Sequence, residues 1–463
     1  MSMCSINKLR KKLWLGMVAA GAIGLFCHPS LAQTELLELL EVLRQNGTLN
    51  EEQYQRLRNE AMATQQREEE ARLAEEQVTE EEEEEKVDIT VKGGKLQFAT
   101  EDEAFSVQIG GRIMADGALY DDDDVKLGDG TEIRRARLFM EGTMWHVWDY
   151  KLQYDFTDSG SDGIRDAYIS YTGFDPTTIT VGNFKEWFSL EELTSSKYIT
   201  FMERALPNAF VPGRHIGAGV FTHGDNWSVS GGLFSEGTDS NQDSETNEGW
   251  GLNARATFAP IYDDNKAVHI GASGYWREPD SDNELRFRER PESHVTNVRL
   301  VDTGTIDDVN NYYGIDGALA AVWGPFSAQG EYIYTKVDRD DASDPDFDGF
   351  YVFGSYFLTG ESRNYDPEDG TFGRVKPFSP VDGEGGIGAW ELALRYSYID
   401  LNDGSIQGGR ENNYTAGLNW YATSHIRFMF NYIRVNAKRE GIAGPGTEYD
   451  NANIYQARAQ IDF

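Results

Sequence analysis

The stretch "YQARAQIDF" (residues 455–463) alternates between two kinds of side chain along its whole length. The odd positions are apolar or small, namely Tyr455, Ala457, Ala459, Ile461 and Phe463, and the even positions are polar, namely Gln456, Arg458, Gln460 and Asp462. Successive side chains of a β-strand point to opposite faces, so this period of two predicts a strand with one apolar and one polar face.

The same alternation recurs upstream, for example in "FSVQIGGRIMAD" (105–116), "YKLQYDFT" (150–157) and "IRFMFNY" (426–432). From residue 93 onward it marks roughly 16 strands, with an uncertainty of about two. Short turns alternate with long polar connections such as "VDRDDASDPDFDG" and "NYDPEDGTFG". A soluble sandwich rarely uses so many strands in one domain, so we predict an all-β transmembrane barrel of about 16 antiparallel strands, with short turns at one end and long loops at the other.

The first 32 residues have the layout of a signal peptide. Lys8, Arg10, Lys11 and Lys12 precede an apolar run at 13–26, and small residues precede a cleavage point that we expect after Ala32. Both cysteines of the chain lie inside this segment. The exported chain would therefore contain no thiol and no disulfide bond.

Residues 33–92 differ in kind from the rest and form our second expected domain. Leucines at helical spacing, a break at Asn46-Gly47 and a capping box at Asn50 and Gln53 predict a periplasmic helical hairpin that leads into a coiled coil. Six consecutive glutamates, residues 80–85, predict a solvated acidic linker, and a charged spacer beyond Ala74 is the alternative. The third expected domain, residues 93–463, is the barrel.

The sequence lacks the motifs that common catalytic and metal sites require. It has no Gly-x-Ser-x-Gly, His-Glu-x-x-His or Cys-x-x-Cys, and its seven histidines are scattered. The run Asp121 to Asp124 lacks the spacing of a calcium loop, so we interpret it as solvated surface, with loose divalent-cation or lipopolysaccharide contacts as the alternative. We expect no enzymatic activity, no metal and no cofactor.

A barrel of this width has an aqueous lumen, which needs a constriction to become selective. The candidate is the stretch "NFKEWFSLEELTSSKYITFMERALPNAFVPGR" (183–214), which is long and carries its own apolar side chains. A loop in solvent would not need them, whereas a loop packed against an inner wall would. We therefore expect it to fold into the lumen, and an extracellular flap is the alternative.

The stretch "EIRRARLFMEG" (132–142) places three arginines beside apolar residues in an acidic chain. Alternation puts Arg135 and Arg137 toward water and Leu138 and Met140 toward lipid. Arg134 would then face lipid, where a charged Arg costs ~2–4 kcal/mol at the bilayer midplane. We expect Arg134 at the rim of its strand, unless the strand starts after it or a bulge turns it inward.

Several motifs together resemble the phosphate-selective porin O/P family. They are "QIGGRIMADG", "EIRRARLFMEG" followed by "YKLQYDF", "YISYTGFDPTTITVG" (168–182) and "FKEWFSLEELTSSKYITFMERALPNAF". The resemblance covers about residues 93–463 and is strongest in 105–235. It implies a trimeric porin of the bacterial outer membrane, through which small hydrophilic solutes and ions diffuse passively. In anion-selective members of the family, an eyelet of arginines and a file of basic residues draw phosphate through.

The resemblance also indicates which residues line the pore and bind anions. Arg112 matches the Gly-Gly-Arg motif, Arg134 and Arg135 match the Arg-Arg-Ala motif, and Lys197 is a weaker match in the loop. With Arg137 from the same strand and Arg204 from the loop, the predicted set is Arg112, Arg134, Arg135, Arg137, Lys197 and Arg204. Ordinary salt bridges in the wall are the alternative: Arg112 with Asp116, and Arg135 or Arg137 with Glu141 or Asp155.

The overall charge opposes anion selectivity. From residue 93 onward the sequence holds 31 Lys and Arg against 60 Asp and Glu. This long-range field repels anions, although the field at a narrow constriction is less screened than across a loop surface. The alternative function is therefore a general or weakly cation-preferring porin that links the outer membrane to the cell wall through its coiled coil.

The expected partners follow from these parts. They are outer-membrane lipid and lipopolysaccharide, two further copies of the chain in a homotrimer, and peptidoglycan through residues 34–85. A terminal aromatic on a closing strand, here Phe463, resembles the signal by which the barrel-assembly machinery recognises its substrates. We expect no nucleic-acid partner.

Overall fold

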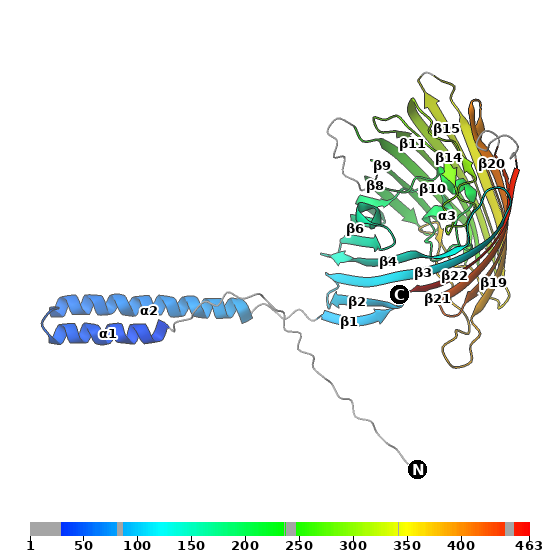
Figure 1. Cartoon of the computed structure of the whole chain (residues 1–463). Coiled ribbons are helices and arrows are strands. Elements are labelled where there is room, and N and C mark those ends of the chain that lie inside the picture. The colour runs from blue at the N-terminus through cyan, green and yellow to red at the C-terminus, as the bar shows by residue number, and fades with distance from the viewer. Residues whose placement is uncertain (1–28, 81–86, 236, 238–246, 341, 440–448) are drawn as a thin grey trace, which may run out of the picture. The chain divides into compact units, whose positions relative to one another are not determined.

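The computed structural model describes residues 29–80, 87–235, 237, 247–340, 342–439 and 449–463. The chain divides into two compact units, Met1–Glu85 and Lys86–Phe463 (Figure 1). Most of the expected signal peptide, residues 1–28, and most of the glutamate run, residues 81–85, lie outside the described ranges.

The second unit is a closed antiparallel β-barrel, in which the described residues form 16 strands (Figure 1). Each strand pairs with the next, and β22 pairs with β3 to close the barrel. The strands are β3 (Ser106–Asp122), β4 (Gly130–Met144), β5 (Trp148–Asp155), β6 (Ile164–Phe174), β7 (Thr177–Lys185), β8 (Arg214–Gly224), β9 (Trp227–Phe234), β10 (Trp250–Asp263), β11 (Lys266–Glu278), β14 (Val309–Trp323), β15 (Phe326–Arg339), β16 (Asp346–Phe357), β19 (Ala389–Asp403), β20 (Ile406–Tyr421), β21 (Ile426–Lys438) and β22 (Tyr449–Asp462). The predicted fold class is confirmed.

The alternation read from the sequence gives the two faces of the wall. In β22, Tyr455 and Ile461 are exposed on the outer face, whereas Arg458 and Asp462 are buried on the inner face. Two-residue turns such as Gly324-Pro325 connect the strands at one end, here called the turn end, where the final residue Phe463 also lies. The opposite end is called the loop end.

A hairpin precedes the barrel at the turn end. β1 (Val87–Lys92) and β2 (Lys95–Thr100) join through Gly93 and Gly94, whose φ angles of 58° and 81° suit a tight type I′ turn. β2 continues the sheet by pairing with the start of β3. Residues 87–92, which we had expected in the acidic linker, are thus a strand, because two glycines allow the chain to fold back on itself.

The first unit contains two helices, α1 (Pro29–Gln45) and α2 (Glu51–Glu80), joined by a short connection. The predicted capping box opens α2, because the Asn50 side chain accepts from the Gln53 amide at 2.8 Å and Gln53 accepts from the Asn50 amide at 3.1 Å. Leu40 and Tyr54 are buried between the helices. None of the described helices is long and apolar enough to cross a membrane.

Three described connections pack against the inner wall of the barrel. The 186–213 loop contains α3 (Leu190–Leu193) and the 3-10 helix η2 (Leu206–Phe210). The 279–308 loop contains β12 (Arg288–Glu289) and β13 (Val301–Asp302), and the 358–388 loop contains β17 (Tyr365–Asp366) and β18 (Thr371–Phe372). A further 3-10 helix, η1 (Gly160–Gly163), precedes β6.

The apolar residues of the 186–213 loop bury themselves inside the barrel. Phe188 and Leu206 pack with inward side chains of β15 and β16, among them Val337 and Phe347, and all four are almost fully buried. The loop therefore lies in the lumen as predicted, and the extracellular-flap alternative is wrong.

The other two loops differ from the sequence-based expectation. Phe287 and Val301 of the 279–308 loop join the same apolar cluster. The 358–388 loop, which includes "NYDPEDGTFG", joins β16 to β19 at the turn end, although we expected long loops at the other end. Its Tyr365 and Phe372 are buried against the wall. This apolar contact holds the loop inside the barrel, although most of its residues are polar.

Candidate functional site: a basic passage along the β3–β8 wall

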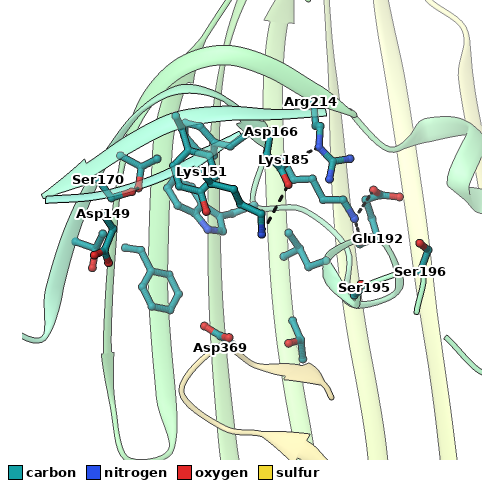
Figure 2. A pocket seen from close by; sticks show the side chains of 18 of the residues that line it. Asp149, Lys151, Asp166, Ser170, Lys185, Glu192, Ser195, Ser196, Arg214 and Asp369 are labelled. Atoms are coloured by element: carbon teal, nitrogen blue, oxygen red, sulfur yellow. Dashed lines mark hydrogen bonds and ion pairs between the residues drawn. The ribbon is translucent and has the colours of Figure 1, made fainter. Parts of the chain in front are cut away.

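Loop packing fills the lumen beside β15, β16 and β19, and cavities remain beside β3 to β8. The larger cavity, here called the chamber, has a volume of about 610 Å³ and extends toward the turn end. A smaller cavity of about 380 Å³, here called the vestibule, reaches the loop end near Asp162 and Gly237. Figure 2 shows the side chains that project into the chamber.

The chamber and the vestibule meet at a ring of side chains that we call the neck. Both cavities are lined by the same five described residues, Arg135, Arg137, Glu192, Arg204 and Arg214. The neck therefore places four guanidinium groups and one carboxylate where the two cavities adjoin.

Three of the four neck arginines are fixed by the wall or by the 186–213 loop. Arg137 Nε lies 2.7 Å from an Asp155 carboxylate oxygen, and Arg214 Nε lies 2.7 Å from Asp166. Arg204 donates to backbone carbonyls of the loop and lies 3.0 Å from the Glu192 carboxylate. The Arg137–Asp155 pair is the wall salt bridge that we considered as an alternative.

Arg135 is less fully paired than its neighbours. Its nearest carboxylate, Glu203, is 3.7 Å from Nη1, and its Nε finds no hydrogen-bond acceptor among the described residues. The side chain is only 4% exposed. Arg135 therefore brings a guanidinium whose charge is only partly neutralised to the lining of both cavities.

Arg134 turns into the lumen through a β-bulge. Across the β3–β4 pair, Met114 faces Arg135 and Ala115 faces Ile133, so Arg134 is the extra residue. The bulge brings two consecutive arginines to the inner side and removes Arg134 from lipid. The expected rim position is therefore wrong, and the bulge that we weighed against it is present. Arg134 lines the vestibule.

Arg112 projects from β3 into the chamber. Its Nη1 donates to the Ser196 hydroxyl at 2.7 Å and lies 3.4 Å from the Ser195 hydroxyl. The expected alternative, a pair with Asp116, is wrong, because Asp116 is held by Arg458 at 2.6 Å.

Lys197 of the 186–213 loop lies outside the described linings of the chamber and the vestibule. Its ammonium is 6.0 Å from the centre of the Phe139 ring and 5.2 Å from that of Tyr198. Burial, and next the charge of Arg112, lower the pKa of Lys197 to about 7.

The predicted pore-lining set did not include other cations of the chamber. Lys151 lies 3.0 Å from Glu141, Lys185 lies 2.8 Å from Glu192, and Arg255 donates to a carbonyl of the 358–388 loop at 2.7 Å. Alternation already placed Lys151 on the polar face of its strand, so this signal was available. The side chains of Lys151, Lys185 and Arg214 gather around two carboxylates in Figure 2.

The chamber is positively charged although the chain as a whole is strongly acidic. Among the described residues of its lining, eight are Lys or Arg and four are Asp or Glu. The whole chain has a formal net charge of −36. Acidic residues such as Asp123 and Asp124 lie exposed at the loop end, where solvent and salt screen them.

Arginines of β19, β21 and β22 hold the loop that contributes Glu192 and Arg204 to the neck. Arg395, Arg427 and Arg458 donate hydrogen bonds to backbone carbonyls within residues 199–203. From β15, the Glu331 carboxylate accepts the Glu191 amide at 3.0 Å. These inward arginines therefore position the 186–213 loop.

A closed barrel of 16 antiparallel strands, apolar outside and narrowed inside by an inward loop, defines a porin-type channel of the outer membrane. Residues 107–463 match the model of the family "Phosphate-selective porin O and P", and the chain belongs to this family. The protein is accordingly an outer-membrane porin, located in the bacterial outer membrane, and forms a channel for passive diffusion.

Two curated proteins and one solved structure illustrate the relationship. Porin O of Pseudomonas aeruginosa is 32% identical over 418 residues, which cover 81% of this chain and 92% of that protein. An uncharacterized protein of Caulobacter vibrioides is 33% identical over 392 residues, which cover 81% and 77%. The outer membrane channel DcaP of Acinetobacter baumannii has a TM-score of 0.50 at 12% identity, covering 79% of this chain and 99% of that one, and shares the fold.

Proposed function

We propose that this porin is anion-selective and that phosphate is among the anions that cross its neck. The observation that carries the proposal is the neck itself, with four guanidinium groups and one carboxylate. The name of the family, "Phosphate-selective porin O and P", points the same way. Passage involves no chemistry, so the protein acts as a channel and not as an enzyme.

The guanidinium groups act by replacing part of the hydration shell of the anion. Arg135 lines both cavities with its charge only partly neutralised, and Arg112 contacts neutral hydroxyls, so both guanidinium groups can attract a passing anion. The carboxylates beside Arg137 and Arg214 lower the affinity of the neck for an anion. A permeating anion must bind weakly enough to leave again.

The acidic surface does not contradict this selectivity. Charges at the exposed loop end act over about a Debye length, ~8 Å at physiological salt, and are screened beyond it. Charges in the narrow neck are desolvated and act directly on the ion. Local charge at the constriction therefore decides which ion passes.

Block of the current by phosphate tests the proposal. Phosphate added to the full-length porin in planar bilayers should lower the KCl conductance, because it occupies the neck. Replacing Arg135 and Arg214 by Gln should weaken this block by about tenfold or more. Arg286→Gln is the control, since Arg286 is an exposed arginine that pairs with Asp302 outside both cavities. Absence of block in the unaltered porin, or equal block in the neck variant, would contradict the proposal.

A second proposal concerns the N-terminal unit. Its helices expose Leu39, Val42, Leu57 and Met62, which a solvated hairpin leaves without cover. We propose that these residues associate between copies in a homotrimer as a periplasmic coiled coil, which touches peptidoglycan. Deleting residues 34–85 should reduce trimer stability or cell-wall association while conductance stays the same. If neither property changes, the segment is a spacer.

A further inference from the structure

We propose that the chamber prefers organic anions that carry an aromatic ring over bare inorganic anions and over aliphatic anions of the same charge. This proposal rests on the anion selectivity proposed above and specifies the class of solute. It is carried by a wall of aromatic side chains that lines the same cavity as the cations.

Four aromatic side chains form a continuous series along the chamber. They come from β6, β7, the 186–213 loop and β8, and are Tyr168, Phe184, Trp187 and Phe221. Their ring centres are 6.0 Å apart between Tyr168 and Phe184 and 5.3 Å apart between Phe184 and Trp187. Trp187 and Phe221 lie nearly parallel, at 6.4 Å and 24°.

Two members of this series, Trp187 and Phe221, are not ordinary core residues. Phe188, the neighbour of Trp187 in the loop, is fully buried in the apolar cluster. Trp187 and Phe221 are only partly buried and border the chamber. Apolar rings that border an aqueous passage leave surface that a hydrophobic ligand would cover.

The Trp187 indole packs against the inner wall at a glycine of β8. A Cβ atom at Gly219 of β8 would lie 2.3 Å from Cζ3 of Trp187, so the indole rests directly on a glycine. This close approach fixes the ring against the inner wall and keeps it beside the passage. The aromatic surface is thus held in place by the strand beneath it.

The polar groups of the chamber complement such a ligand. Lys151 and Arg214 are directed at Asp166, and Lys185 is directed at Glu192 beside them (Figure 2). They can receive a phosphate or carboxylate group while the aromatic part of the solute lies on the rings. Sites that combine an apolar wall with a few convergent polar groups are typical for small organic ligands.

The size of the chamber agrees with this class of solute. Its volume of about 610 Å³ falls in the range of roughly 300–1,000 Å³ that is common for pockets of small organic molecules. Inorganic phosphate would fill only part of this space and would leave the rings exposed. The chamber is therefore larger and more apolar than a site for inorganic phosphate requires.

Two phosphate esters separate the contribution of the ring from that of the charge. The full-length porin is placed in planar bilayers, and KCl conductance is titrated with phenyl phosphate and with methyl phosphate, at an alkaline pH where both are dianions. Phenyl phosphate should block at roughly tenfold lower concentration. In the variant with Trp187→Ala and Phe221→Ala the two esters should block alike, while methyl phosphate keeps its half-blocking concentration.

Matched variants separate the rings of the chamber from aromatic residues in general. Trp187→Phe should keep most of the preference, because a ring remains. Trp323→Ala should change nothing, since Trp323 is exposed at the turn end of β14, away from the chamber.

Equal block by the two esters in the unaltered porin, or a preference that survives in the double variant, would overturn the proposal. The first comparison needs no variant, so it decides even if the double variant does not assemble. Failure of anion selectivity itself would look different, because neither ester would then block.

Discussion

Arg134 of β4 holds Glu203 of the 186–213 loop with two hydrogen bonds, Nε to Oε1 at 2.9 Å and Nη2 to Oε2 at 3.1 Å. The same carboxylate lies 2.6 Å from Arg458 on the far side of the β3–β22 closure and 3.7 Å from Arg135. One loop carboxylate thus lies among three wall arginines, of which Arg458 also pairs with Asp116. This arrangement ties the loop to the strand pair that closes the barrel and leaves excess positive charge beside the neck.

Neutralising Glu203 should increase anion preference. In Glu203→Gln the three arginines lose their shared counter-charge, and the anion-to-cation permeability ratio should rise about twofold or more. Zero-current potentials in a KCl gradient measure this ratio. Glu203→Asp keeps the charge and should resemble the unaltered porin. An unchanged ratio in Glu203→Gln would mean that this cluster does not influence permeating ions.

Anion preference should fall as the pH rises through about 7. Lys197 carries its charge below its pKa of about 7 and loses it above, and this charge lies close to Arg112. Zero-current potentials in KCl alone, without phosphate, should therefore shift toward cations between pH values of about 6 and 8. Lys197→Met should remove the shift. A shift of the same size in Lys197→Met would assign it to another group.

A methyl group at Gly219 should disturb the part of the chamber wall that Trp187 forms. The added Cβ would overlap the Trp187 indole, and such overpacking costs about 1–3 kcal/mol of folding stability. Gly219→Ala should lower the urea midpoint of the refolded barrel and change its conductance. Gly317→Ala is the control, because its Cβ would have no neighbour within 4 Å among the described residues. Equal midpoints for both variants would show that Trp187 moves aside freely.

Replacing Phe463 should reduce assembly of the porin into the membrane and leave permeation through each channel unchanged. Its backbone pairs with Gly111 at 2.8 and 3.0 Å, and its ring is partly exposed at the turn end. If the assembly machinery recognises this residue, Phe463→Ala should lower the amount of porin in the outer membrane several-fold, while the conductance per channel stays the same. Quantitative immunoblots of membrane fractions together with single-channel recordings test this. Normal amounts would assign Phe463 to packing alone.

Much of the fold could be predicted because the lipid and the lumen impose opposite demands on alternate residues. The last strand shows this directly, with Ile461 outward and Arg458 inward as expected. The inward positions of Arg112 and Arg135 follow from the same rule. The apolar residues of the 186–213 loop likewise indicated its place, since a large apolar side chain such as Phe188 is stabilised by burial and not by exposure to solvent.

Other features depend on contacts between distant segments, which a single sequence does not reveal. The bulge at Arg134 depends on how β3 and β4 align, and one extra residue leaves no local signature. The two further loops enter the lumen through a few apolar residues, such as Phe287 and Phe372, within polar stretches. Whether an inward cation is paired depends on the neighbouring strand: Lys151 meets Glu141, whereas Arg112 meets serines.

The zero-current potential of the unaltered porin in a KCl gradient tests the central claim most directly. If the four neck arginines select the ion, chloride crosses faster than potassium, and the dilute compartment becomes negative. Replacing chloride by phosphate should then change the potential, because phosphate occupies the neck. A positive dilute compartment, unchanged when phosphate replaces chloride, would show that the acidic surface and not the neck determines selectivity.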